Sequence, residues 1–211
     1  MMSFNWKTAA AVGLAGAALA TGCGSAAVTH STTAHRATAR SATAPEATAP
    51  APAAFAWLRP APAPAGWRLR RLGATATLAY PPSWQRIRSD PGTASAAVVA
   101  PRTRLITAYL NATPQQADET LADWTSFRPA HNRDEGDSQD QVLAAARDLR
   151  FRNGRGSCVI DRYRTSRARY TEIACLVRGP AGETVIVAAG LAARWAQEAP
   201  ALERAVSAFL A

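Results

Sequence analysis

Lysine and histidine are scarce in this sequence. Lys7 is the only lysine, and the three histidines are His30, His35 and His131. Two of these histidines fall in an Ala/Thr-rich stretch, so a zinc site built from cysteine and histidine lacks partners, and we predict no metal and no cofactor. Beyond residue 22 every basic residue is an arginine, and the formal net charge of +9 falls to +8 once Lys7 is removed.

This excess of arginine favours anionic partners. Anionic lipid head groups or other anionic envelope polymers would match the charge. The sequence contains no recognisable DNA- or RNA-binding module, and the export signal described next places the chain away from nucleic acid. We therefore predict no nucleic-acid partner.

The apolar run near the N-terminus is too short to span a membrane permanently. Residues 8–20 follow Lys7 without a charge, but they fall short of the roughly 30 Å of hydrocarbon and are typical of the h-region of an export signal. Small residues then lead into Cys23, an ending that resembles the lipobox of bacterial lipoproteins, with Ala20 where leucine is usual. We expect residues 1–22 to be a cleaved signal peptide and Cys23 to carry diacylglycerol.

The lipid on Cys23 would anchor the protein in the cell membrane, on its extracytoplasmic face. The alternative is an ordinary secreted protein that is cut near Ala20 or Gly22. In both cases the mature chain lies in a compartment that permits disulfide bonds.

The segment over 23–65 consists almost entirely of Ala, Thr, Ser and Pro after its first cysteine. It has too little apolar surface to offset its ordering entropy, so we predict a disordered linker. As a flexible coil of roughly 40 residues it would hold the domain on the order of 35 Å from the bilayer. Phe55, Trp57 and Leu58 form one apolar island, which either docks on the domain or clusters transiently.

Regular apolar patterning covers residues 66–211, a span typical of one domain. The patterns and turn residues predict strands over 67–72, 76–80, 94–100, 104–110, 157–165, 170–178 and 183–189. Tyr80-Pro-Pro-Ser-Trp84 forces an extended bend after the second of these strands. Residues 142–149 fit either a strand or a short helix.

Two helices accompany the strands. Thr113 as N-cap, Pro114 at the first helical position and Gln116 three residues after the cap form a capping box, and Pro129 should end this helix. The second helix begins at Pro200. Its apolar face consists of Leu202, Ala205, Val206 and Phe209. Strands in runs plus two helices predict an α+β fold, an antiparallel sheet flanked by helices.

Cys158 and Cys175 are the two cysteines left once Cys23 is lipidated. If the hairpin between them turns at Ser166 and Arg167, the two cysteines face each other across neighbouring strands, with Cβ atoms roughly 4.5–5.5 Å apart. We predict a structural disulfide. A redox-active pair is the alternative, but the spacing differs from Cys-X-X-Cys.

The same register fixes further cross-strand pairs. It sets Asp161 opposite Glu172, which is unfavourable unless an arginine lies between them. The neighbouring pairs are Ile160 with Ile173 on the face of the cysteines and Val159 with Ala174 on the other face.

The segment over 130–141 concentrates titratable side chains around His131, and we predict a solvated polar loop. One alternative is an envelope hydrolase that uses His131 with a nearby acid and a serine, although no Gly-X-Ser-X-Gly elbow accompanies it. Another is calcium binding by Asp134, Asp137 and Asp140, whose spacing does not match an EF-hand loop.

Tryptophans and arginines are the remaining candidates for a binding role. The tryptophans are spread over separate elements, which favours a place in the core; they are Trp67, Trp84, Trp124 and Trp195. Five arginines fall on or beside the first strands, where they form either one basic face for an anionic surface or a solvated face. They are Arg68, Arg70, Arg71, Arg86 and Arg88.

The order of elements runs from Gly66-Trp67 through the Tyr80-Pro-Pro-Ser-Trp84 bend, a helix and Gly-turned strands to a terminal helix ending in Val206-Ser-Ala-Phe209. Over residues 66–211 this order resembles the PsbP-like domain of the photosystem extrinsic protein, of a eukaryotic Ran-binding protein and of LpqN-type actinobacterial lipoproteins. The resemblance implies an α/β/α sandwich around an antiparallel sheet. It also implies a non-catalytic domain that binds or scaffolds, with no catalytic residue to carry over.

The sequence therefore predicts a lipid-anchored extracytoplasmic protein whose domain is a non-catalytic, monomeric binding or scaffold module. Its expected partners are the membrane, through the N-terminal lipid, and anionic envelope polymers or another envelope protein. The alternatives are a carrier of an apolar ligand between sheet and helix, and the hydrolase around His131.

Overall fold

A computed structural model describes residues 52–73, 76–116 and 118–211. The predicted signal peptide, the lipidation site Cys23 and the predicted linker up to residue 51 lie outside the described residues. Within the described ranges, no helix has the length and apolar character needed to cross a membrane.

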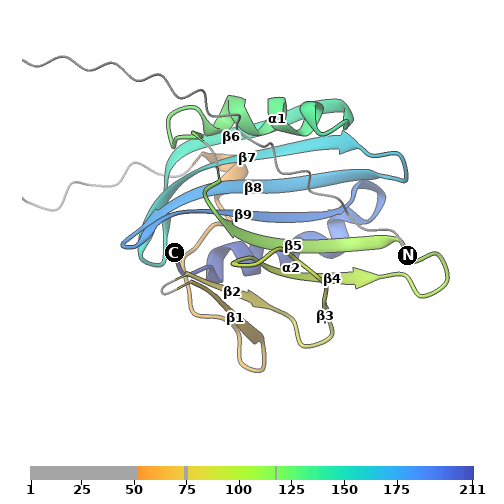
Figure 1. Cartoon of the computed structure of the whole chain (residues 1–211), viewed down its shortest axis with the longest axis horizontal. Helices are drawn as coiled ribbons and strands as arrows, with labels where there is room; N and C mark the ends of the chain where they lie inside the picture. Colours follow the sequence, from red (N-terminus) through yellow and green to blue (C-terminus); the bar gives the residue numbers. More distant parts are fainter. Residues whose placement is uncertain (1–51, 74–75, 117) are drawn as a thin grey trace, which may run out of the picture. The chain divides into compact units, whose positions relative to one another are not determined.

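Seven antiparallel strands form the main sheet, in the order β3-β4-β5-β9-β8-β7-β6 (Figure 1). Their bounds are β3 Gln85–Arg86, β4 Ala94–Val99, β5 Ile106–Pro114, β6 Ser138–Phe151, β7 Gly154–Arg164, β8 Arg169–Gly179 and β9 Gly182–Leu191. The predicted strands of this sheet are confirmed, with ends that shift by a few residues. The ambiguous segment over 142–149 belongs to β6.

A second, two-stranded ladder is formed by β1 (Arg68–Leu72) and β2 (Ala76–Tyr80), as predicted. Gly73 begins their connection with φ +53, a left-handed conformation that glycine adopts without steric cost. The other side of β2 meets the end of the chain, because the Thr77 N–H donates to the Leu210 carbonyl at 2.8 Å.

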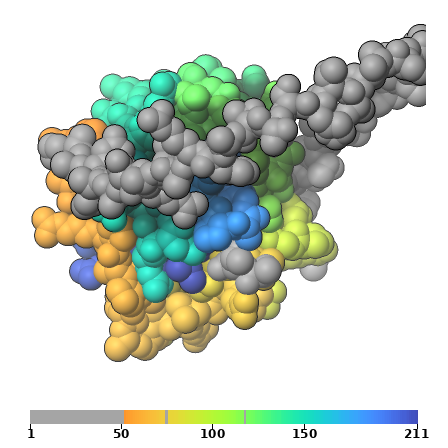
Figure 2. Space-filling view, turned by 90° about the vertical axis from the view of Figure 1, so that its left-hand side faces the viewer, coloured from red at the N-terminus to blue at the C-terminus, as the bar shows by residue number. Residues whose placement is uncertain are grey.

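The apolar island ahead of these strands packs on the domain. Phe55, at the end of the short 3-10 helix η1 (Ala53–Phe55), has no exposed surface, and Leu58 lies in the same core. The segment then runs beside Ser207, whose Oγ accepts the Arg59 N–H at 3.3 Å. Figure 2 shows this segment, in orange, against the body of the domain. Of the two outcomes left open for the island, the structure shows docking.

Helices cover both faces of the main sheet. The helical elements are α1 (Trp124–Asp134), η2 (Ala192–Arg194) and α2 (Trp195–Ala208). Because side chains alternate along a strand, Val159 and Ala174 lie on the face that α1 covers, while Cys158 and Ile173 lie on the face that packs with Leu202 of α2. The predicted α+β fold, with its α/β/α layering, is confirmed.

The tryptophans lie in or against the core, as predicted. Trp84 belongs to the larger cluster between the sheet, the β1–β2 ladder and α2, and Trp124 fills the smaller cluster under α1. Trp67 and Trp195 are partly buried and pack against the larger cluster.

The predicted first helix is wrong at both ends. Thr113 and Pro114 end strand β5, where they pair with Val185 and Thr184 of β9. The Gln116 side chain donates to Thr113 Oγ1 at 3.2 Å, but the Gln116 backbone N–H, which would donate to that oxygen in a capping box, donates to Glu119 Oε1 at 3.3 Å instead. Pairing with a neighbouring strand outweighs the local helix signal, as tertiary context commonly does.

α1 begins behind a different capping box. The Thr120 N–H donates to Asp123 Oδ1 at 2.6 Å, and the Asp123 N–H donates to Thr120 Oγ1 at 3.3 Å. The helix then continues through Pro129 instead of ending there. The predicted loop over 130–141 is consequently wrong at both ends, which belong to α1 and β6.

α2 also begins earlier than predicted. It starts at Trp195, and Pro200 lies inside the helix. The predicted apolar face is confirmed, because all of its members are buried; they are Leu202, Ala205, Val206 and Phe209.

The β7–β8 hairpin has the predicted register. Cys158 lies opposite Cys175, the two Cα atoms are 4.1 Å apart, and a disulfide joins the side chains. Asp161 faces Glu172 in the same ladder. The pairs Ile160–Ile173 and Val159–Ala174 are also confirmed.

Strand β6 forms one edge of the sheet and is irregular along its length. Its pairing with β7 shifts register at three places. Gln139 and Asp148 adopt positive φ angles of 54 and 56 degrees at two of them. Irregularities of this kind twist an edge strand away from the flat geometry that recruits another chain.

Removal of the disulfide should destabilise the domain. The bond closes a loop with a sequence separation of 17, which corresponds to about 3 kcal/mol in the loop-entropy model. We expect the Cys158→Ala/Cys175→Ala variant to lose this amount of unfolding free energy in urea titrations. The parent chain measured in reductant is the matched control and should lose a similar amount. An unchanged unfolding midpoint in both would contradict the prediction.

Candidate functional site

Polar side chains fasten α1 to the sheet. Trp124, Arg128 and Asn132 recur at every fourth position, which places them on one face of the helix. The Trp124 Nε1–H donates to the Ala174 carbonyl at 3.0 Å, and the two other side chains reach buried carboxyl groups. The helix is therefore held by a row of specific hydrogen bonds as well as by apolar contact.

Arg128 makes the strongest of these contacts. Its Nε donates to Glu172 Oε1 at 2.7 Å and its Nη2 to Glu172 Oε2 at 3.0 Å, a bidentate pair. Glu172 has no exposed surface, and Arg128 is only 7% exposed. Arg128 of α1 thus compensates the charge of Glu172 in the Asp161–Glu172 pair, although this partner was not predicted from the sequence.

Asp161 shares this buried space but lacks a cation of its own. The Asn132 side chain donates to Asp161 Oδ2 at 3.2 Å, while Asp161 Oδ1 has no hydrogen-bond partner within the described residues. Burial, and secondarily the negative charge of Glu172, raise the pKa of Asp161 from 3.8 to about 8. These effects favour the protonated form of Asp161.

Two further aspartates, Asp137 and Asp140, interact electrostatically with Asp161. Burial and the charge of Glu135 raise the pKa of Asp137 to about 6. Burial also raises the pKa of Asp140, although Arg133 opposes this shift by pairing with Asp140 at 3.1 Å. The three aspartates considered for calcium do not form a group with metal-ligand character in the described part of the chain.

His131 lies on α1, beside this cluster but half exposed. Its ring stacks on Phe127 with centroids 5.7 Å apart, and its Nε2 is 3.4 Å from Glu135 Oε1. These contacts are those of a helix surface residue with an i, i+4 partner.

The five arginines of the predicted basic face do not share one side of a strand. Arg68 and Arg70 alternate with Leu69 and Arg71 along β1, so the two pairs point to opposite sides of the ladder. Leu69 is 60% exposed, which makes it the most exposed large apolar side chain among the described residues. The remaining two, Arg86 in β3 and Arg88 just after it, are exposed.

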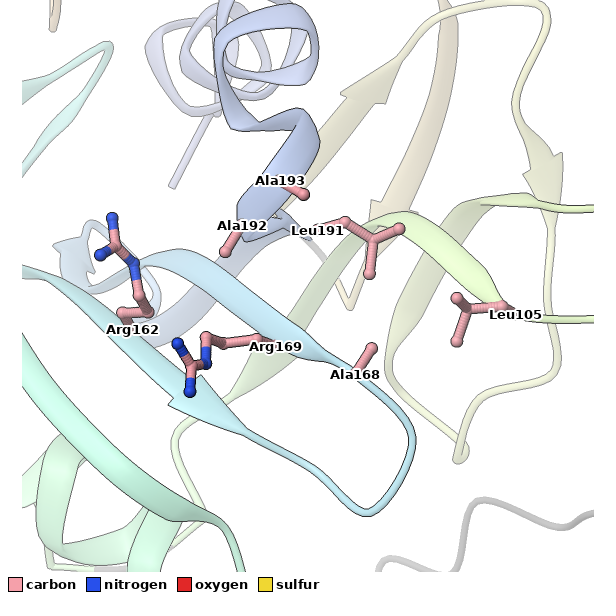
Figure 3. A pocket seen from close by; sticks show the side chains of 7 residues that line it. All are labelled: Leu105, Arg162, Ala168, Arg169, Leu191, Ala192 and Ala193. Atoms are coloured by element: carbon pink, nitrogen blue, oxygen red, sulfur yellow. The ribbon is translucent and has the colours of Figure 1, made fainter.

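A second basic region lies at the turn of the β7–β8 hairpin. Arg162 and Arg169 contribute to the wall of an open pocket of about 550 Å³ (Figure 3). The other lining residues are Leu105, Ala168, Leu191, Ala192 and Ala193. This region was not predicted, although Arg162, Arg164 and Arg169 flank the predicted turn and Arg167 lies in it.

No protein-family model and no curated protein sequence matches the chain. Among solved structures, PsbP from the cyanobacterium Synechocystis sp. PCC 6803 aligns at 14% identity and a TM-score of 0.48, over 69% of this chain and 92% of that protein. PA94 from Pseudomonas aeruginosa, a protein of unknown function, aligns at 13% identity and a TM-score of 0.39, over 67% and 94%. These likenesses concern the fold alone.

Loss of Arg128 should lower the free energy of unfolding, because it leaves the buried charge of Glu172 uncompensated. We expect Arg128→Met to lower the free energy of unfolding by about 3–5 kcal/mol. The Arg128→Met/Glu172→Gln variant should lose clearly less, since no unpaired carboxylate remains next to Asp161. Urea unfolding of the single and double variants measures the difference. A double variant as unstable as the single one would show that the ion pair does not explain the loss.

The buried proton on Asp161 should make stability depend on pH. Between about pH 4 and pH 8 the folded chain keeps a proton that the unfolded chain releases, so stability falls as the pH rises through this range. Asp161→Asn should flatten this slope, leaving the smaller part that comes from Asp137 and Asp140. Thermal unfolding at pH 5 and pH 8 tests this, with the exposed Asp90→Asn as control. Equal slopes in parent and Asp161→Asn would refute it.

Proposed function

We propose that the protein is a lipid-anchored lipoprotein on the extracytoplasmic face of the cell membrane, whose α+β domain acts by binding or scaffolding and not by catalysis. The observation that carries the proposal is the Cys158–Cys175 disulfide. Structural disulfides persist in oxidising compartments outside the cytoplasm. The bond also accounts for two of the three cysteines, which leaves Cys23 available for modification.

The chemistry at Cys23 follows from its sequence surroundings. The uncharged run over 8–20 precedes it, and small residues stand directly before it, as in a lipobox. Diacylglycerol on the cysteine thiol, with cleavage before Cys23, would leave a lipid at the new N-terminus. Diacylglycerol carries two acyl chains, which suffice for stable anchoring, so contact of the domain with the membrane or an envelope partner would orient the domain rather than hold it at the membrane.

The arginines of β1 are the proposed source of that contact. Arg68 is exposed on one side of the strand, and Arg71 and Leu69 are exposed on the other. Basic side chains near an anionic membrane surface contribute about 1 kcal/mol each. The proposed partners are therefore anionic lipid head groups or anionic envelope polymers, with a second envelope protein as the other candidate.

A monomer is the proposed state. The irregular edge strand β6 supports it, because register shifts and two positive-φ residues oppose pairing with the same strand of another copy. Val142 and Leu143 are exposed on this strand but lie next to one of the shifts.

Intact-mass analysis of the protein isolated from membranes tests the anchor. We expect a chain that begins at Cys23 and carries diacylglycerol, with two alkylation sites appearing only after reduction, at Cys158 and Cys175. The Cys23→Ser variant is the control and should lose the added mass and the membrane association. An unmodified soluble parent chain would overturn the anchor, and free thiols before reduction would remove the disulfide on which the proposal rests.

A further inference from the structure

The turn end of the β7–β8 hairpin concentrates positive charge on one face of the sheet. Arg164 lies directly opposite Arg169 in the ladder, and Arg162 is the next residue on the same side of β7. Like charges placed opposite each other on neighbouring strands destabilise a sheet. Among the described residues, none of these three guanidinium groups forms an ion pair with a carboxylate. An anion from outside the chain would remove this repulsion.

The charged groups border a space that can hold a ligand. Arg162 and Arg169 line the open pocket of about 550 Å³, which lies within the size range of small-molecule sites. Figure 3 shows the two arginine side chains on the part of the pocket opposite Leu105, with their guanidinium groups pointing in different directions. Leu105 and Leu191 supply apolar surface on the other part of the wall.

Two polar groups beside the pocket lack hydrogen-bond partners in the described part of the chain. They are the Nε of Arg162 and the hydroxyl of Thr171, which lie opposite each other in the ladder. Thr171 is only 1% exposed. Native proteins satisfy nearly all buried polar groups, and water, an ion or a ligand does so where the chain itself does not.

We infer that this pocket binds a small phosphate ester with a short apolar portion. The phosphate would accept hydrogen bonds from the guanidinium groups of Arg162 and Arg169, whose planar forks suit phosphate oxygens. The apolar portion would lie against Leu105 and Leu191. This inference rests on the proposed function as a binding domain and names the class of its ligand, whether a soluble ester or a lipid head group.

Calorimetric titration with hexyl phosphate tests the site. The full chain carrying Cys23→Ser is used, so that no lipid competes. We expect saturable binding that Arg162→Gln and Arg169→Gln each weaken about tenfold or more, since each removes a charge-assisted hydrogen-bonding group. Arg155→Gln is the matched control, because it removes the same charge from an exposed position at the other end of β7.

The control separates a site from general attraction to a basic protein. Absence of hexyl phosphate binding, or equal weakening by Arg155→Gln, would overturn the inference. Thermal unfolding of each variant shows whether it is folded, and the exposed Arg169 keeps the test decisive if Arg162→Gln is unstable. The intact mass of the parent chain does not depend on hexyl phosphate binding. The proposed pocket and the proposed lipid anchor can therefore be refuted independently of each other.

Vesicles identify the source of the phosphate. Binding to phosphatidylglycerol vesicles but not to phosphatidylcholine vesicles, with displacement by hexyl phosphate, would support the inference with a lipid head group as ligand. Binding of hexyl phosphate without binding to vesicles would support the inference and would identify a soluble phosphate ester as the ligand. Vesicle binding that persists in Arg162→Gln and Arg169→Gln and resists hexyl phosphate would count against a role of this pocket at membranes.

Discussion

In the β7–β8 hairpin, every cross-strand pair is fixed once Cys158 lies opposite Cys175. A shift by one residue would turn each side chain of a strand to the other face of the sheet. Glu172 would then leave the space under α1 and enter the apolar layer that packs on α2. The docking of α1, the main core and the arginine-rich end of the hairpin all depend on this alignment, and a covalent bond holds it.

Under α1 this alignment places the two carboxyl groups of Asp161 and Glu172 side by side in a buried space. The helix compensates one of them through Arg128. The guanidinium group pairs with Glu172, and the raised pKa of Asp161 favours the neutral form of that side chain. Buried ion pairs of this kind contribute little net stability, because desolvation offsets the attraction. Their effect here is to position the helix. Trp124, Arg128 and Asn132 each donate to a different residue of the sheet, which fixes the position of α1 along the strands.

The sequence predicted the parts of the fold that follow from strict alternation and from a single local turn. The β7–β8 register is the clearest case, because the cysteine pair, the apolar pairs and the turn all agree. The first helix was misplaced because Thr113, Pro114 and Gln116 satisfy the rules of a helix start, whereas their actual place is set by strand β9, distant in the sequence. The face of α1 that packs on the sheet was not predicted, because it includes the polar residues Arg128 and Asn132. Spacing reveals a buried helix face only when the residues on it are apolar.

The candidate site was even less accessible from sequence. The arginines around the hairpin turn are visible in the sequence, but an exposed strand commonly carries such charges. The pocket depends on Leu105, Leu191 and Ala192, which three separate elements or connections bring beside Arg162. The arginines on or beside the first strands were expected to form either one basic face or a solvated face, and strand alternation divides those of β1 between the two sides of the ladder.

The irregular edge strand β6 affects whether neighbouring copies of the proposed anchored protein can pair through their sheets. Proteins held at a membrane surface share two dimensions, so neighbouring copies meet far more often than they would in free solution. An open, flat sheet edge would then act as a template on which copies add strand by strand. In the proposed anchored state, the register shifts and positive φ angles at Gln139 and Asp148 would oppose strand addition at this edge.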